Sequence, residues 1–130
     1  DLYRKNVLGF LMVDPIKIQK GEVFLQEGDQ GKEAFYLISG KMEVIKNING
    51  KSVKLSELLE GAIFGEICLI DNQTRTTSVV TLESCSIQKI TPNNIETIIK
   101  KDPDVGLAII KTLTSRFRNI MDLLGSENLA

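Results

Sequence analysis

Short strand-like runs, each followed by a turn signal, constrain the fold of this chain more than any other feature. Gly21, Gly40 and the stretch EGDQGKE separate neighbouring runs. Runs this short with a turn after each predict a β-sandwich or barrel rather than a parallel sheet with helical crossovers. The runs lie between Ile16 and Ile90 and are IKIQ, EVFLQ, AFYLIS, KMEVIK, KSVKLSEL, TSVVTL and CSIQKI.

Asn49-Gly50 gives the clearest local prediction. The pair stands between KMEVIK and KSVKLSEL, which both have the composition of strands. Asparagine and glycine tolerate positive φ, so they favour a tight hairpin turn. The two flanking runs are therefore expected to pair as neighbouring antiparallel strands.

The two ends of the chain have a different character. Residues 1–15 are expected to contain one short helix that packs on the β-structure, and residues 91–124 are expected to form helices. Thr91-Pro92 is a helix start, with the threonine as N-cap and the proline in the first turn. Asp102-Pro103 repeats this signal and begins a longer helix, which is expected to end at Gly125.

The longer helix carries an apolar stripe with the spacing of a heptad repeat. Two interpretations stay open, a helix that lies on its own β-structure and a helix that pairs with a second copy of the chain. Val105 and Ile109 lie on an adjacent face, so the helix has more apolar surface than one seam requires. The stripe consists of Ile110, Leu113, Phe117, Ile120 and Leu124.

Composition excludes several classes of protein. A chain of 130 residues is expected to form a single domain over 1–130, and a net charge of −1 gives no support for direct nucleic-acid binding. The sequence has no histidine, so no zinc site is expected and the commonest general base is missing. No cofactor is expected either. No apolar stretch is long enough to span a membrane. Cys68 and Cys85 lack metal-ligand spacing and are expected to be buried thiols in a reducing, cytoplasmic compartment.

The stretch from Phe64 to Thr77, FGEICLIDNQTRTT, carries the residues suited to binding chemistry. Gly65 allows the backbone to approach a ligand closely, and the free N–H groups of a short helical turn at residues 66–68 favour an anion. Arg75 offers a bidentate fork to a phosphate, and Thr76 and Thr77 add hydroxyl donors. A carboxylate does not suit a phosphate, so Glu66 is expected to accept a hydrogen bond from a sugar hydroxyl. An acid for ribose and an arginine for phosphate together indicate a nucleotide.

The same stretch resembles the phosphate-binding cassette of cyclic nucleotide-binding domains, as found in catabolite-activator-type regulators, protein kinase A regulatory subunits and cyclic nucleotide-gated channels. The stretch KGEVFLQEGDQGKEAFYLISGKMEV and the segment EGAIFGE are similar to the glycine framework of that family. The resemblance implies a mainly β fold, an eight-stranded β-roll over 16–90 with flanking helices and a cassette at 64–77. It also implies cAMP or cGMP as ligand. The matching framework glycines are Gly21, Gly28, Gly31, Gly40 and Gly61.

The resemblance assigns expected roles to single residues. Glu66 would bind the ribose 2′-hydroxyl and Arg75 the cyclic phosphate, while Thr76 would touch phosphate or base. The long helix would form a lid over the base. Cassette residues expected to line the ligand are Phe64, Gly65, Glu66, Ile67, Cys68, Arg75, Thr76 and Thr77; the lid residues are Phe117, Ile120 and Met121.

Two departures from the family pattern leave the base preference open. Thr77 stands where alanine is common, and Ile120 and Met121 fall where the bacterial activators present a Thr-Ser pair to adenine. Neither Ile120 nor Met121 can hydrogen-bond a base through its side chain. Thr76 directly after the arginine resembles cGMP-responsive members, although cAMP binders also carry a threonine there.

The sequence thus predicts a regulatory module rather than an enzyme. Binding of a cyclic mononucleotide would be relayed through the terminal helices to an attached domain or a partner protein. The alternative is a module of the same fold that has lost its ligand and serves for interaction or dimerisation through the C-terminal helix, since a fold alone does not establish a function.

Overall fold

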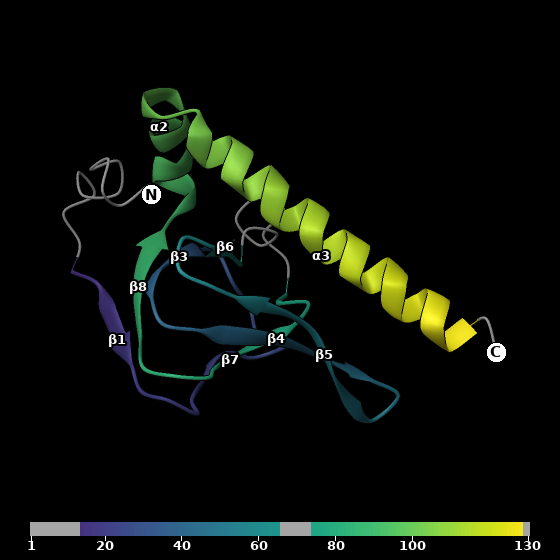
Figure 1. The fold of residues 1–130 in the computed structure, drawn as a ribbon. Helices are drawn as coiled ribbons and strands as arrows, with labels where there is room; N and C mark the ends of the chain where they lie inside the picture. The colour runs from purple at the N-terminus through teal and green to yellow at the C-terminus, as the bar shows by residue number, and fades with distance from the viewer. Residues whose placement is uncertain (1–13, 66–73, 129–130) are drawn as a thin grey trace.

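The computed structural model describes residues 14–65 and 74–128, without the side chains of residues 92–94 and 126–128. Its eight strands form two four-stranded antiparallel sheets, with helices after the last strand (Figure 1). The mainly β prediction and the eight-stranded roll are confirmed. The expected N-terminal helix and the helical turn at residues 66–68 lie outside the described residues.

One sheet has the strand order β1-β8-β3-β6, and the other has the order β2-β7-β4-β5. Most neighbouring strands are far apart in the sequence, as where Ile18 pairs with Cys85, and β4 and β5 are the exception. The strands are β1 (Ile16–Ile18), β2 (Val23–Leu25), β3 (Ala34–Ser39), β4 (Met42–Ile48), β5 (Lys51–Leu58), β6 (Ile63–Phe64), β7 (Ser78–Thr81) and β8 (Cys85–Ile90).

The hairpin between β4 and β5 forms as predicted. Ile48 pairs with Lys51, which leaves Asn49 and Gly50 as a two-residue turn with φ of 54° and 82°. Positive φ at both central positions is the type I′ geometry that matches the twist of the strands. The Asn47 side chain accepts a hydrogen bond from the Gly50 N–H at 2.9 Å, which closes the turn.

The first four residues of β3 are buried because both faces of the strand are covered there. Phe35 and Leu37 point into the space between the two sheets, where they join the larger core cluster. Ala34 and Tyr36 point to the opposite face, where they pack beneath the C-terminal helices. A strand buried on both sides loses the alternation of apolar and polar residues, which accounts for the run AFYLI.

Two helices follow the roll, α2 (Pro92–Lys101) and α3 (Asp104–Asn128). The predicted start of α2 at Pro92 is confirmed. The Asp102 carboxylate accepts a hydrogen bond from the Asp104 N–H at 3.0 Å, as expected of the predicted N-cap. The predicted end of α3 at Gly125 is wrong, because the helix continues to Asn128. Gly125 does not adopt the positive φ of a helix C-cap, and a glycine weakens a helix interior without ending it.

The first half of α3 is attached to the roll through the same cluster that includes α2. Val105 is fully buried, and Ala108 and Ile109 pack against this cluster. Near the other end of α3, Leu123 contacts the core between the sheets. None of the helices in the described part of the chain is long and apolar enough to cross a membrane.

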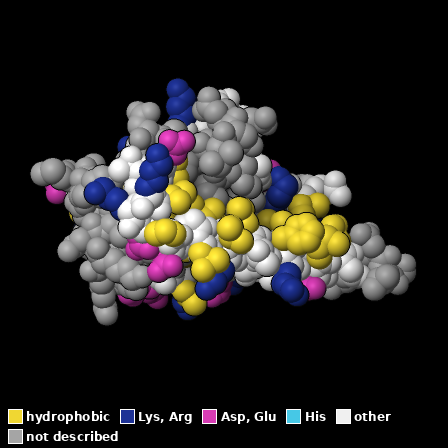
Figure 2. All heavy atoms as spheres, turned by 90° about the horizontal axis from the view of Figure 1, so that it is seen from above, with side chains coloured by type: hydrophobic (Ala, Val, Ile, Leu, Met, Phe, Trp, Pro, Cys, Tyr) yellow, Lys and Arg dark blue, Asp and Glu magenta, His cyan; other side chains and the backbone are white. Residues whose placement is uncertain are grey.

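The apolar stripe predicted along α3 does not face the roll. Its members are between 37% and 65% exposed, so the first of the two interpretations, packing on the chain's own β-structure, is wrong for these side chains. Figure 2 shows hydrophobic side chains in a row over the length of this helix. They are Ile110, Leu113, Phe117, Ile120 and Leu124, and the exposed Leu107 and Met121 lie beside them.

Candidate functional site

Arg75 lies three residues before the start of β7, and its backbone is fixed to the segment between β2 and β3. The Arg75 N–H donates to the carbonyl of Asp29 at 2.7 Å, and the Gly28 N–H donates to the carbonyl of Arg75 at 2.9 Å. An isolated bridge between Gln30 and Thr74 extends this pairing. The backbone of Arg75 is therefore held by the roll itself.

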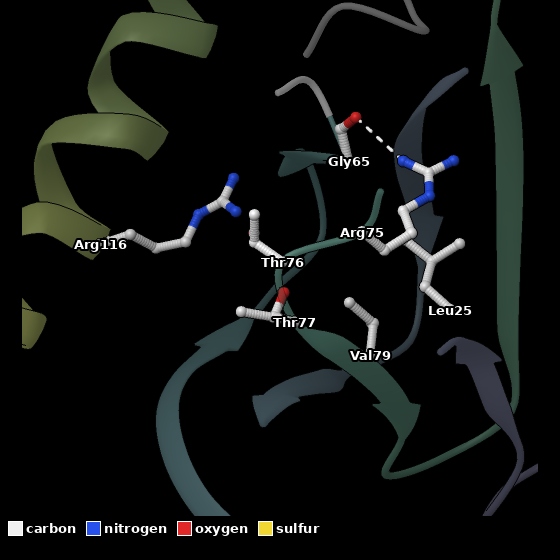
Figure 3. A pocket seen from close by; sticks show the side chains of 7 residues that line it. All are labelled: Leu25, Gly65, Arg75, Thr76, Thr77, Val79 and Arg116. Atoms are coloured by element: carbon white, nitrogen blue, oxygen red, sulfur yellow. Dashed lines mark hydrogen bonds between the residues drawn. The ribbon is translucent and has the colours of Figure 1, made fainter. Parts of the chain in front are cut away.

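The guanidinium of Arg75 is enclosed, and the residue is only 7% exposed. Its Nη1 donates a hydrogen bond to the carbonyl of Gly65 at 3.1 Å, drawn as a dashed line in Figure 3. Its Cζ lies 5.6 Å from the centre of the Phe35 ring, a cation–π distance. Gly65 has a φ of 76°, a conformation that favours glycine and that sets its carbonyl toward Nη1.

This buried cation has no countercharge among the carboxylates that the structure describes. Glu33, which lines a cleft beside Arg75, lies 3.9 Å from the ammonium of Lys89 instead. Burial of a charge without a partner is unfavourable, and a guanidinium has five N–H donors, of which Gly65 uses one. The arrangement is suited to receive an anion from outside the chain.

A small cavity lies beside Arg75, between the end of the cassette and α3 (Figure 3). Arg116 of α3 points toward Thr76 and Thr77 across this space. The free volume is about 20 Å³, enough for roughly one water molecule and far below the 300–1,000 Å³ of typical ligand pockets. A larger ligand does not fit in this cavity as it stands. The lining residues are Leu25, Gly65, Arg75, Thr76, Thr77, Val79 and Arg116.

A separate groove lies beside this cavity along α3. Arg116 lines both spaces, and the groove of about 240 Å³ runs between α3 and the end of β5. The hydroxyl of Ser56 is buried at this groove and makes no hydrogen bond with any described residue. The groove thus offers a polar group that a ligand could satisfy.

Lys46 fixes the threonine end of the site. Its ammonium donates to the carbonyl of Thr76 and to the carboxylate of Glu27, both at 2.9 Å. The Asn47 N–H also donates to Glu27, at 3.0 Å. This backbone hydrogen bond and the ammonium of Lys46 lower the pKa of Glu27 below its ordinary value, so the carboxylate stays charged to a lower pH than an ordinary glutamate.

The structure brings together Gly65, Arg75, Thr76 and Thr77 of the predicted site residues. Phe64 is fully buried and stacks on Phe35 with ring centres 5.5 Å apart, so its side chain belongs to the core. Glu66, Ile67 and Cys68 lie outside the described residues, and their expected roles stay predictions.

The expected lid residues Phe117, Ile120 and Met121 are all exposed, and the residue of α3 that reaches the cavity is Arg116. Sequence reasoning missed Arg116. A signal for it exists in hindsight, because Arg116 follows Ile109 and Thr112 at the spacing of a helix face that packs on the roll.

Comparison with known proteins identifies relatives that match most of this chain. The family model described as the cyclic nucleotide-binding domain matches residues 15–102. The Pycsar effector protein XpPycTIR of Xanthomonas perforans is 34% identical over 114 residues, which are 87% of this chain and 35% of that protein. The chain therefore spans about a third of the length of this relative.

Solved structures agree with the sequence comparison. The catabolite activator protein of Thermus thermophilus has a TM-score of 0.75 at 24% identity, over 94% of this chain and 58% of that one, and shows the fold. The EAL enzyme Bd1971 in its cAMP-bound form is 30% identical with a TM-score of 0.62, over 88% of this chain and 31% of that one. A cGMP-bound form of the same enzyme is 27% identical with a TM-score of 0.61, over 87% of this chain and 29% of that one.

Proposed function

This chain belongs to the cyclic nucleotide-binding domain family, and from that membership we propose that it binds cAMP or cGMP at Arg75 and relays the binding through α3. Its fold is that of a regulatory domain, and no reaction is part of the proposal. Bd1971, a similar enzyme, has solved forms with either nucleotide, which supports the ligand class but does not choose the base.

The observation that carries the proposal is the buried guanidinium of Arg75. It is 7% exposed, its backbone is fixed by Gly28 and Asp29, and no described carboxylate forms an ion pair with it. A cyclic phosphate supplies one negative charge and two exocyclic oxygens, which match the planar fork of an arginine. The ligand would therefore remove the cost of an unbalanced buried charge.

The other polar groups of the cavity are proposed to orient the nucleotide. Thr76 and Thr77 can donate hydroxyl protons to the phosphate, and Arg116 can approach it from the side of α3. Glu66 is proposed to accept a hydrogen bond from the ribose 2′-hydroxyl, as the resemblance implies. No metal or cofactor is part of this proposal.

The base is proposed to extend into the groove along α3. Ser56 offers a buried hydroxyl there, and Arg116 lies between this groove and the phosphate cavity. A hydroxyl can both donate and accept a hydrogen bond, so Ser56 is compatible with adenine and with guanine.

The small volume of the cavity supports a relay. About 20 Å³ of free space cannot hold a nucleotide by itself, so binding is proposed to displace the wall that carries Arg116. A ligand shifts an equilibrium between two positions of α3 only if its contacts differ between them, and Arg116 supplies such a contact. The effector that receives the signal would be an attached domain or a partner protein, in a cytoplasmic and reducing compartment that suits the free, buried thiol of Cys85.

The test is a calorimetric titration of the purified chain with cAMP and cGMP side by side, together with Arg75→Ala. We expect the parent chain to bind at least one nucleotide and the variant to bind it at least about tenfold more weakly, because charged hydrogen bonds contribute about 1.5–3 kcal/mol. The melting temperature without ligand should hardly change, since the substitution breaks no ion pair with a described residue. A parent that binds neither nucleotide would exclude the proposed function.

A dimer built through α3 is the second proposed role, and the exposed stripe favours it. Ile110, Phe117 and Leu124 are 60%, 65% and 48% exposed, whereas packed α3 residues such as Val105 are fully buried. Large apolar side chains at heptad spacing on one exposed face are suited to a second copy of the same helix. This role is compatible with ligand binding and would also remain if the chain bound no nucleotide.

A further inference from the structure

Gly31 is a buried residue, and its backbone conformation does not require a glycine. Glycines such as Gly28 and Gly50 have φ of 91° and 82°, conformations that other residues rarely adopt. Gly31 shows no positive φ, so its backbone would accept an ordinary residue. The reason for a glycine at this position must therefore lie in the space around its Cα atom.

That space is filled by the guanidinium of Arg75. A Cβ atom added to Gly31 would lie 2.7 Å from Nη2 of Arg75, and closer still to Nε and Cζ. These are the three nearest heavy atoms, and real Cβ atoms essentially never approach another atom within 3.0 Å. The Cα atom of Gly31 thus forms one wall of the guanidinium site, with the Phe35 ring and the Gly65 carbonyl as the others.

We infer that Gly31 is a positioning residue, which holds the guanidinium of Arg75 in the place where it meets the anion. The step from guanidinium position to nucleotide affinity rests on the proposed function. The position of the guanidinium itself does not, because it follows from the contacts of the chain alone.

A side chain at residue 31 would displace the guanidinium of Arg75 rather than the backbone around it. Neighbouring backbone cannot yield easily, since the Asp29 carbonyl and the Gly28 N–H are both bonded to the backbone of Arg75. The guanidinium is the end of a flexible side chain, so it is the group that moves. Its hydrogen bond to Gly65 would be lost first, whereas the strands of the roll would keep their pairing.

The closing experiment compares Gly31→Ala with the parent chain in two measurements. The first follows the Nε–H resonance of Arg75 by ¹⁵N–¹H correlation spectroscopy without ligand, with Arg75→Lys to assign the signal. The second is calorimetric titration with cAMP and cGMP. We expect the resonance to shift or broaden and the affinity to fall by at least about tenfold, the scale of a weakened charged hydrogen bond.

Gly106→Ala is the matched control. Gly106 also lacks a positive φ, and the nearest atom to an added Cβ there is Ile99 Cγ2, at 3.8 Å, which is ordinary van der Waals contact. The Arg75 resonance and the nucleotide affinity of this variant should equal those of the parent.

A double substitution separates positioning from general destabilisation. In a chain that already carries Arg75→Ala, adding Gly31→Ala should cause no further loss of affinity, because the group that it displaces is absent. If Gly31→Ala alone fails to fold, the added Arg75→Ala should restore folding, since every one of the three nearest atoms belongs to Arg75.

The outcomes distinguish this inference from the proposed function. An unchanged Arg75 resonance together with unchanged affinity in Gly31→Ala would overturn the positioning role. A shifted resonance in a chain whose parent binds neither nucleotide would support the position of Gly31 and reject the proposed ligand.

Discussion

At the scale of single residues, the site depends on a cation that is buried before any ligand arrives. Lysine in place of Arg75 would be a point charge on a flexible stem and could not present a planar fork to two phosphate oxygens. The guanidinium is held on three sides by Gly31, Gly65 and Phe35, so its orientation is set in advance. Pre-organisation of this kind favours affinity, because the ligand does not have to order the side chain.

Cys85 shows a different effect of burial. Loss of water around the thiol raises its pKa above the ordinary value, and a backbone hydrogen bond from Lys41 opposes this only in part. The pKa of Cys85 is therefore higher in the folded chain than in the unfolded chain. The contribution of the protonated thiol to the free energy of unfolding is fully present below the unfolded-state pKa, and it is lost as the pH rises through the folded-state pKa.

We therefore predict that Cys85 stays a thiol in the folded chain at pH 8. Its alkylation by iodoacetamide, followed by peptide mass spectrometry, should be at least about tenfold slower than in the urea-unfolded chain, because the thiolate is the reactive form. Equal rates in the folded and the unfolded chain would contradict the burial of this side chain.

At the scale of elements, α3 carries two rows of residues along its length, and each residue of one row precedes a residue of the other by one position. Ile110, Leu113, Phe117, Ile120 and Leu124 are apolar and exposed. The face that lies on the roll contains Ile109, Thr112, Arg116, Asn119 and Leu123, all of which are partly buried. The position of a residue around the helix decides whether it faces the roll, whatever its polarity. The inner face can therefore include the polar groups that a ligand cavity needs.

Truncation after Thr112 should separate the fold from the lid function of α3. The retained part keeps Val105, Ala108 and Ile109 in the core, so the roll should stay folded. Loss of Arg116 should weaken nucleotide binding by about ten- to a hundredfold, the size of a typical coupling energy, mainly through faster dissociation.

The measurement is stopped-flow dissociation of a fluorescent cyclic nucleotide, with circular dichroism as a test of folding. A chain truncated after Leu124 serves as control, because it retains Arg116 and Leu123. If the shorter chain folds and releases the nucleotide at the parent rate, α3 is not a lid.

At the scale of the whole molecule, α3 joins the ligand cavity to a free surface. The helix of 25 residues is about 37 Å long at 1.5 Å per residue, and it extends past the edge of the roll (Figure 1). One of its faces lines the cavity through Arg116, and another carries the apolar stripe. Movement of the helix would therefore alter the binding site and the exposed surface together.

We predict that the parent chain forms a dimer in sedimentation equilibrium and that Phe117→Gln shifts it toward monomer. Phe117 is 65% exposed, so its replacement should leave the melting temperature of the monomer unchanged. Arg118→Gln, at the adjacent exposed position, is the control and should not alter the dimer. A parent chain that stays monomeric up to about 100 μM, where a micromolar complex would be populated, would refute the α3 dimer.

The sequence by itself predicted short strands in a β-sandwich or barrel, the hairpin at Asn49-Gly50, and helix starts at Pro92 and Asp102, while the eight-stranded roll followed from the family resemblance. These features depend on local chemistry, since turns need positive φ, helix starts need caps, and short apolar runs have the length of strands. β6 was missed, because two residues give no periodicity and Ile63-Phe64 becomes a strand only by pairing with Phe35 and Tyr36. Tertiary structure alone decided which face of α3 lies on the roll, that Arg116 reaches the cavity, and that Gly31 contacts a guanidinium. Each of these depends on the distance between residues far apart in the chain, and packing sets that distance after the sheets have closed.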